Sequence, residues 1–138
     1  MIQFEAEDID IPIFITNETA DWIANVIKKF GKRVGELRYI FCTDEFLYNL
    51  NVKYLDHNTY TDIITFDTSE NPDYIAGEMF ISLERVAENA VINSKSVENE
   101  LFRVLIHGVL HLIGFNDKLE SEIIEMRSQE EKCLSLLS

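Results

Sequence analysis

Two histidines one helical turn apart are the residues of this chain best suited to chemistry. His107 and His111 lie in the mostly apolar segment 101–117. Side chains four positions apart leave the same face of an α-helix, and two imidazole nitrogens at this spacing can bind one metal ion. Gly114 is expected to end the helix, and Asp117 follows within reach of the same face. We therefore predict a metal centre formed by His107, His111 and Asp117.

The alternative is a pair of core histidines that only satisfy hydrogen bonds. A buried polar group left without a partner costs about 1–3 kcal/mol, so two histidines on one apolar face would need several buried partners. The glycine stop and the carboxylate beyond it favour the metal centre. Two imidazoles and one carboxylate also leave a tetrahedral ion one position short, which is typical of catalytic sites rather than structural ones.

The spacing H-x-x-x-H-x-x-G-x-x-D resembles the metalloprotease pattern H-E-x-x-H-x-x-G-x-x-H. In that pattern the glutamate is the general base. Gly108 stands at its position here. Peptide hydrolysis would therefore lack its base at the expected place.

Length and composition indicate an ordinary globular protein. The chain has 138 residues, 46% hydrophobic and 27% charged, which fits a single domain over 1–138 and excludes disordered and fibrous classes. The formal net charge of −13 argues against a protein that coats nucleic acid, although six of the basic residues lie between positions 22 and 53. Cys42 and Cys133 are expected to be thiols of a reducing compartment. No export signal or membrane segment is apparent, so we expect a cytoplasmic protein.

Hydrophobic periodicity predicts alternating strands and helices. Strands are expected at 2–6, 37–42, 63–66 and 79–81. Helices are expected to be capped by Thr16 or Asn17, Asp44, Ser82 and Ser96, with a last amphipathic helix near the C-terminus. The prediction is an α+β fold with one small mixed sheet of about four strands and helices packed on it. Its central buried helix carries the two histidines.

Several blocks of the sequence resemble the YbeY family of endoribonucleases. The histidine block H-G-V-L-H-L-I-G-F matches the family pattern H-G-x-L-H-L-x-G-[YF]-D-H up to its last two positions. Weaker matches, in chain order, are L-N-V-K-Y at 50–54, T-D-I-I-T-F at 61–66, G-E-M-F-I-S at 77–82, and Met126 with Glu130. The chain is thus similar to this family from about residue 47 to 133.

The resemblance implies a metal-dependent, single-strand-specific endoribonuclease of ribosomal RNA. By this resemblance the protein would mature the 3′ end of small-subunit ribosomal RNA and act in ribosome quality control. Its partners would be single-stranded rRNA and the ribosome or ribosomal proteins. One zinc ion would be held by His107, His111 and a third position, which is histidine in the family and Asp117 here. An oxygen ligand makes harder divalent metals, such as manganese, more acceptable.

Two further residues are candidates for the chemistry. Glu78, where the family has an aspartate, is expected to be a general base or to orient water, and the alternative is a solvated carboxylate at a strand end. His57 is expected to donate a proton or to contact phosphate, and the alternative is an exposed loop histidine. Tyr54 and Tyr60 are candidates for stacking on RNA bases.

Leu55 is the departure with the largest consequence for function. The family has an arginine there, and a guanidinium fork suits phosphate oxygens. Lys53, His57, Arg85 and Arg103 are possible substitutes, and the sequence does not choose among them.

Two other classes of function remain open. One is a metal-dependent hydrolase of another substrate. The other is a non-catalytic ribosome-assembly factor with a bound metal, which the acidic net charge and Leu55 favour. Such a factor would bind basic ribosomal proteins through complementary charge.

Overall fold

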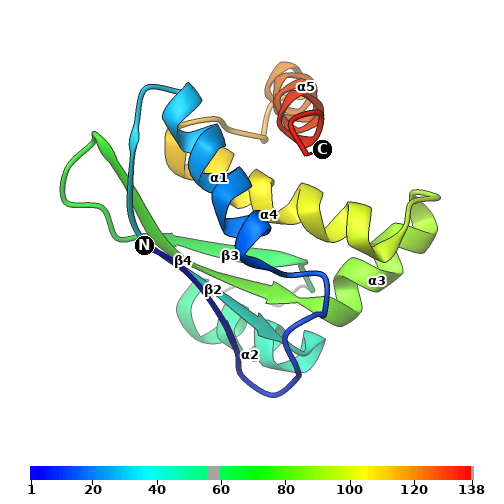
Figure 1. Cartoon of the computed structure of the whole chain (residues 1–138). Coiled ribbons are helices and arrows are strands. Elements are labelled where there is room, and N and C mark those ends of the chain that lie inside the picture. Colours follow the sequence, from blue (N-terminus) through cyan, green and yellow to red (C-terminus); the bar gives the residue numbers. More distant parts are fainter. Residues whose placement is uncertain (56–59, 138) are drawn as a thin grey trace.

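A mixed four-stranded sheet forms the centre of the structure (Figure 1). The computed structural model describes residues 1–55 and 60–137. The strands are β1 (Ile2–Ala6), β2 (Arg33–Cys42), β3 (Ile63–Asp67) and β4 (Tyr74–Ser82), in the order β1-β2-β4-β3. β1, β2 and β4 are parallel, and β3 pairs with β4 in the antiparallel direction. The predicted α+β fold with a small mixed sheet is confirmed.

Helices pack on both faces of this sheet. Within the described ranges they are α1 (Asn17–Lys29), α2 (Asp44–Leu55), α3 (Leu83–Ile92), α4 (Val97–Ile113) and α5 (Glu120–Leu134). α1 and α4 cover one face, α2 lies under the other, and α5 packs on α4 (Figure 1). In these same ranges, every helix is too short or too polar to cross a lipid bilayer.

The sheet separates two apolar clusters, one on each face. Leu37, Tyr39 and Phe41 of β2 belong to the larger cluster, which α4 also joins. The Tyr39 hydroxyl donates a hydrogen bond of 2.9 Å to the carbonyl oxygen of Leu105 in α4. Because side chains alternate along a strand, the residues between these three point to the other face of the sheet, where Cys42 of β2 joins the smaller cluster. This alternation decides which side chains of β2 and β4 can approach α4.

Three of the predicted helix caps are confirmed. Thr16 is the N-cap of α1, which begins at Asn17. The Ser82 hydroxyl accepts a hydrogen bond of 3.1 Å from the Arg85 backbone N–H at the start of α3. The Ser96 hydroxyl accepts one of 3.0 Å from the Asn99 backbone N–H at the start of α4. Both bonds satisfy backbone donors that an α-helix leaves free at its N-terminus.

The predicted Asp44 cap is wrong. Thr43 precedes α2, and its hydroxyl accepts the hydrogen bond of 3.3 Å from the Phe46 backbone N–H. The Asp44 carboxylate instead accepts a hydrogen bond of 2.7 Å from Arg85 Nη2 in α3. An aspartate close to a partner guanidinium gains more from the ion pair than from capping a neutral N–H.

Two strands begin earlier than the sequence pattern predicts. β2 begins at Arg33 rather than Leu37, and β4 begins at Tyr74 rather than Met79. Arg33 pairs with Tyr74, and the register between the strands shifts before Leu37. Glycines in both extensions interrupt the β-branched runs on which the prediction depends.

The single tryptophan of the chain joins α1 to α5. The Trp22 indole N–H donates a hydrogen bond of 2.9 Å to the carbonyl oxygen of Cys133, and its side chain is 5% exposed. Cys133 and Cys42 are both buried free thiols. Burial raises the pKa of Cys133 to about 11 and that of Cys42 to about 12, so both stay protonated near neutral pH.

Two glycines let α4 lie close against the sheet. A Cβ atom at Gly77 would lie 2.7 Å from the backbone oxygen of Phe66 and 3.1 Å from Leu112 Cδ1. A Cβ atom at Gly108 would lie 2.6 Å from Met79 Sδ. The first contact involves backbone held in the sheet, whereas the second involves a flexible side chain.

We predict that Gly77→Ala lowers the free energy of unfolding by about 1–3 kcal/mol, because the new methyl group cannot displace the β3 backbone. Urea unfolding of the purified variant measures this change. Gly108→Ala is the matched control and should cost less, since the Met79 side chain can shift. An equal or smaller loss for Gly77→Ala would contradict the prediction.

Candidate metal centre

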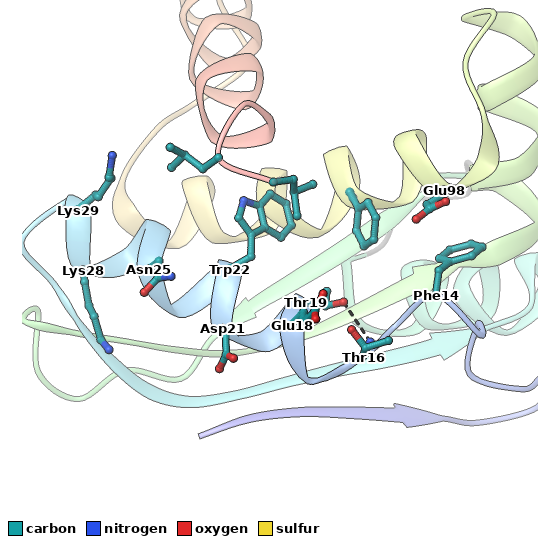
Figure 2. Close-up of a pocket in the computed structure, with 13 residues that line it drawn as sticks. Phe14, Thr16, Glu18, Thr19, Asp21, Trp22, Asn25, Lys28, Lys29 and Glu98 are labelled. Atoms are coloured by element: carbon teal, nitrogen blue, oxygen red, sulfur yellow. Dashed lines mark hydrogen bonds between the residues drawn. The ribbon is translucent and has the colours of Figure 1, made fainter.

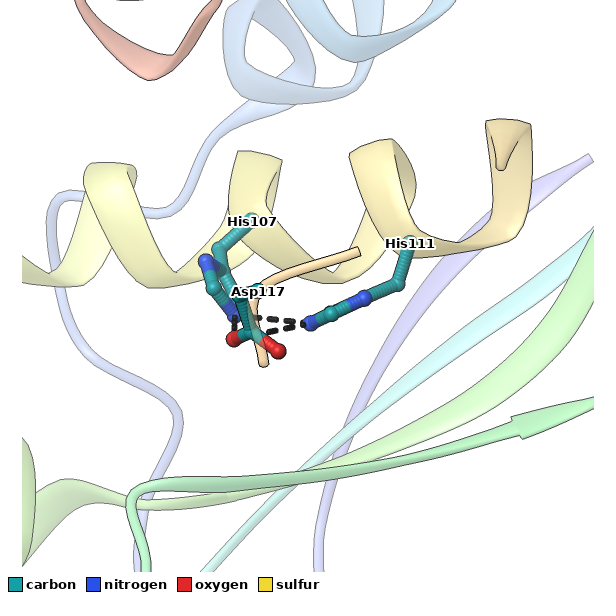
Figure 3. A group of neighbouring side chains, drawn as sticks. All are labelled: His107, His111 and Asp117. Carbon is teal, nitrogen blue, oxygen red and sulfur yellow. Dashed lines mark hydrogen bonds and ion pairs between the residues drawn. The ribbon is translucent and has the colours of Figure 1, made fainter. Parts of the chain in front are cut away.

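Three predicted ligands come together at one end of α4. His107 and His111 project from the same face of the helix, and Asp117 approaches them from the following loop (Figure 3). The two Nε2 atoms are 3.0 Å apart, and Asp117 Oδ2 lies 3.3 Å from each of them. The structure therefore brings together two nitrogen donors and one oxygen donor, as the helical spacing predicts.

Gly114 positions the third donor. Its φ of 126° is one that side-chain-bearing residues rarely adopt, and it ends α4 at Ile113. The backbone N–H groups of Gly114 and Phe115 both donate to the Leu110 carbonyl oxygen, at 3.1 and 3.0 Å. The chain turns back at this point, so Asp117 returns to the face that carries the histidines.

A backbone carbonyl fixes the orientation of the His111 ring. His111 Nδ1 lies 3.0 Å from the Phe115 carbonyl oxygen. Because a carbonyl only accepts hydrogen bonds, Nδ1 must carry the proton. The lone pair is then on Nε2, the atom that faces His107 and Asp117. The turn after α4 therefore positions Asp117 and also fixes the tautomer of His111.

A buried carboxylate does the same for His107. Glu130 of α5 lies with Oε2 2.5 Å from His107 Nδ1, and its side chain is 2% exposed. Burial disfavours the charged carboxylate, but the hydrogen bond from His107 and the charge of Arg103 outweigh it and hold the pKa of Glu130 below its usual value. An ionised acceptor at Nδ1 again leaves Nε2 free to bind a metal, as in carboxylate–histidine–metal arrangements.

Arg103 links this carboxylate to the start of α4. Its Nη1 donates to both Glu130 oxygens at 3.2 and 3.3 Å, and its Nε and Nη2 donate to Glu100 at 3.1 and 2.6 Å. The three side chains are 2%, 16% and 1% exposed for Glu130, Arg103 and Glu100. These contacts raise the pKa of Arg103 despite its burial, so the guanidinium stays charged. The network anchors Glu130 where it can hold His107.

The donor set and its spacing fit a small divalent ion. Zinc ligands at about 2.0–2.2 Å in a tetrahedral arrangement stand about 3.3–3.6 Å from one another. The three donor atoms are separated by 3.0–3.3 Å, close to that spacing. Among the described residues, these three form the group of histidine, cysteine or acidic side chains whose ligand atoms lie close enough together to hold one metal ion. Three protein donors leave one tetrahedral position for water or substrate.

A cleft of about 670 Å³ opens beside these donors. Its walls come from the end of α2, from β3, from α4 and from the loop after α4. The residues are Asn51, Leu55, Thr61, Asp62, Ile63, Ile64, Thr65, Asp67, His107, His111, Leu112, Asp117 and Lys118. A larger hollow of about 1190 Å³ lies elsewhere, between α1 and the C-terminal residues (Figure 2). The larger hollow contains none of the three donors, so the smaller cleft is the candidate functional site.

The structure does not bring Glu78 to this centre. Gly77 and Met79, its neighbours in β4, face α4, so Glu78 points to the opposite face of the sheet. There its carboxylate forms an ion pair with Arg38, which also donates a hydrogen bond of 2.7 Å to Glu5. The predicted catalytic role of Glu78 is therefore not supported by its position. The other predicted catalytic residue, His57, lies outside the described residues.

The arginines proposed to replace the missing phosphate contact at Leu55 are engaged elsewhere. Arg85 binds Asp44 at 2.7 Å, and Arg103 is enclosed by carboxylates. Lys53 is exposed, and its Nζ lies 5.2 Å from the ring centre of Tyr54. None of these three cations is among the described residues that line the cleft.

The aromatic side chains proposed to stack on bases make contacts within the protein. Tyr60 stacks on Tyr48 with ring centres 4.6 Å apart, and the Arg85 guanidinium lies 5.3 Å from the Tyr60 ring centre. Tyr54 packs edge-on against Phe66, with ring centres 6.4 Å apart. Both tyrosines remain more than half exposed.

Glu130 is the important residue that sequence reasoning left without a role. A signal was present: Met126, Glu130 and Cys133 share one face of α5, and all three are buried. An acidic residue on an apolar stripe needs a buried partner. The pattern of α5 alone does not reveal that this partner is His107.

Comparison with known proteins gives consistent matches over the whole chain. The profile of the family described as Endoribonuclease YbeY matches residues 1–138. A protein named Endoribonuclease YbeY from Phocaeicola vulgatus is 46% identical over 138 residues, covering 100% of this chain and 99% of its own. One of the same name from Porphyromonas gingivalis strain W83 is 45% identical, covering 99% and 89%. A solution structure from Thermotoga maritima has the same fold, with a TM-score of 0.67, 24% identity, and coverage of 98% of this chain and 90% of that one.

We predict that Glu130→Gln weakens zinc binding by about 10–100-fold, the usual cost of losing a partner behind a metal ligand. The glutamine amide can donate to His107 Nδ1 and so favour the tautomer that cannot bind through Nε2. Competition with a chromophoric chelator measures the affinity. Glu131→Gln, an exposed neighbour on the same helix, is the control. Equal zinc affinity in both variants would refute the role of Glu130.

Proposed function

The chain belongs to the endoribonuclease YbeY family, and we propose that it is a metal-dependent endoribonuclease that cleaves single-stranded ribosomal RNA. The proposed ligands are His107, His111 and Asp117, with zinc as the proposed ion. The proposed task is maturation of the 3′ end of small-subunit ribosomal RNA. The observation that carries the proposal is the convergence of three donors, two with fixed tautomers, in an open cleft.

The proposed chemistry divides between the ion and the chain. A bound divalent ion would supply Lewis-acid polarisation of a phosphodiester oxygen. The chain contributes two neutral imidazoles and one carboxylate as donors, and Glu130 and the Phe115 carbonyl hold the imidazoles in the binding tautomer. The walls of β3 and α2 would hold an extended strand beside these donors. Pre-orienting the donors lowers the cost of reorganisation during the reaction.

Two alternatives receive less support. Peptide hydrolysis would need a base where Gly108 stands, and a Cβ atom there would lie 2.6 Å from Met79 Sδ, so a glutamate does not fit without rearrangement. A non-catalytic assembly factor would not need an open coordination position. The metal arrangement therefore favours the nuclease, and the experiment below separates the two.

We predict that the zinc-loaded protein cleaves single-stranded ribosomal RNA, and that His111→Ala reduces the rate by at least about a hundredfold, more than the loss of an outer-shell partner. Gel electrophoresis of a labelled transcript measures the rate. Asn116→Ala, an exposed neighbour in the same loop, should keep full activity. A chelator should abolish cleavage, and added zinc should restore it. Stoichiometric zinc binding without cleavage would instead support the assembly factor.

We predict that Asp117→His raises the preference for zinc over manganese by at least about tenfold, because imidazole is the softer donor. Competition titrations of both ions against the same chelator give the ratio of dissociation constants. The parent protein, with its oxygen donor, should show the smaller ratio. An unchanged ratio would mean that residue 117 is not a ligand.

A further inference from the structure

The walls of the cleft carry more negative than positive charge. Asp62, Asp67 and Asp117 line it. Among the described residues, Lys118 is the one lysine or arginine that lines the cleft. If both imidazoles are neutral, the two charges of a bound divalent ion and the charge of Lys118 only balance the three carboxylates. The cleft then has no net positive charge. An RNA strand is a chain of phosphates, so it needs a local cation to enter such a cleft.

The arginines near the site are held by partners, and Lys53 of α2, although exposed, does not line the cleft. Arg103 approaches the cleft wall, with Nη2 3.8 Å from Asp62 Oδ2, but Glu100 and Glu130 enclose it. Arg85 is held by Asp44, and on the far face of the sheet Arg38 is held by two carboxylates. A guanidinium already neutralised by carboxylates would have to break those contacts to bind a phosphate.

Lys118 differs from these residues in two ways. Its side chain is exposed, and it forms no ion pair with the carboxylates of the described residues. It also directly follows Asp117, in the loop whose course Gly114 fixes, so its backbone is held next to the metal donors. At the other wall, α2 contributes only the uncharged Asn51 and Leu55.

We propose that Lys118 binds an RNA phosphate adjacent to the metal centre and supplies the cation that the α2 wall lacks. This inference rests on the proposed function. A lysine ammonium binds phosphate as a point charge and does not need the geometry of a guanidinium fork. The contact reads the backbone and not the base, so it contributes affinity without sequence preference.

The test is binding of a fluorescent single-stranded oligonucleotide with 2′-O-methyl riboses to the zinc-loaded protein. Fluorescence anisotropy gives the dissociation constant over a range of salt concentrations, and electrophoresis checks that the strand stays intact. Lys118→Ala should weaken binding roughly tenfold, as expected for one charge-assisted contact. It should also reduce the slope of log K against log salt by about 0.7, the value for one phosphate on a single strand.

Three comparisons make the result specific. Lys118→Arg keeps the charge and should restore most of the affinity and slope. Lys132→Ala removes an exposed lysine of α5 outside the cleft and should change neither. The zinc affinity of Lys118→Ala should match that of the parent, which separates loss of a phosphate contact from disturbance of Asp117.

The outcomes distinguish this inference from the proposed function. If the parent binds the strand and Lys118→Ala binds it with equal affinity and equal salt slope, the role of Lys118 is refuted while the nuclease proposal stands. If the zinc-loaded parent binds no strand, the proposed function fails and this inference fails with it.

Discussion

The hydrogen bond between Glu130 and His107 is the contact on which the candidate centre depends. It crosses from α5 to α4, and it fixes the ring nitrogen that faces the other two donors. Glu130 stays ionised in a buried position only because Arg103 and His107 both stabilise its charge. A candidate metal ligand on the central helix is thus oriented by a residue of α5.

This arrangement has an energetic cost that the rest of the fold must offset. Three charged groups lie largely out of water, and burying charges is favourable only when each has good partners. Arg103 donates hydrogen bonds to both Glu100 and Glu130. Among the described residues, no buried side-chain polar atom lacks a hydrogen-bond partner. Such a network is a poor source of stability, but it leaves few alternative positions for Glu130. We infer that the network serves to hold Glu130 in position rather than to stabilise the fold.

The sequence predicts best what local periodicity determines. The spacing of His107 and His111, the stop at Gly114 and the caps at Ser82 and Ser96 all depend on residues within a few positions of each other. It fails where the outcome depends on pairing across the fold. The face on which Glu78 lies follows from strand parity, and one residue of register reverses it. The capping role of Thr43 follows from the distant Arg85, which takes the carboxylate of Asp44.

The single indole of the chain lies at the junction that joins the first helix to the last. Trp22 is shielded from solvent and bonded to the backbone of α5 only three residues beyond Glu130. Its emission spectrum is consequently an intrinsic optical reporter of whether the C-terminal helix is docked. Detachment of that helix would shift the emission to longer wavelength and at the same time release the imidazole of His107 from its carboxylate.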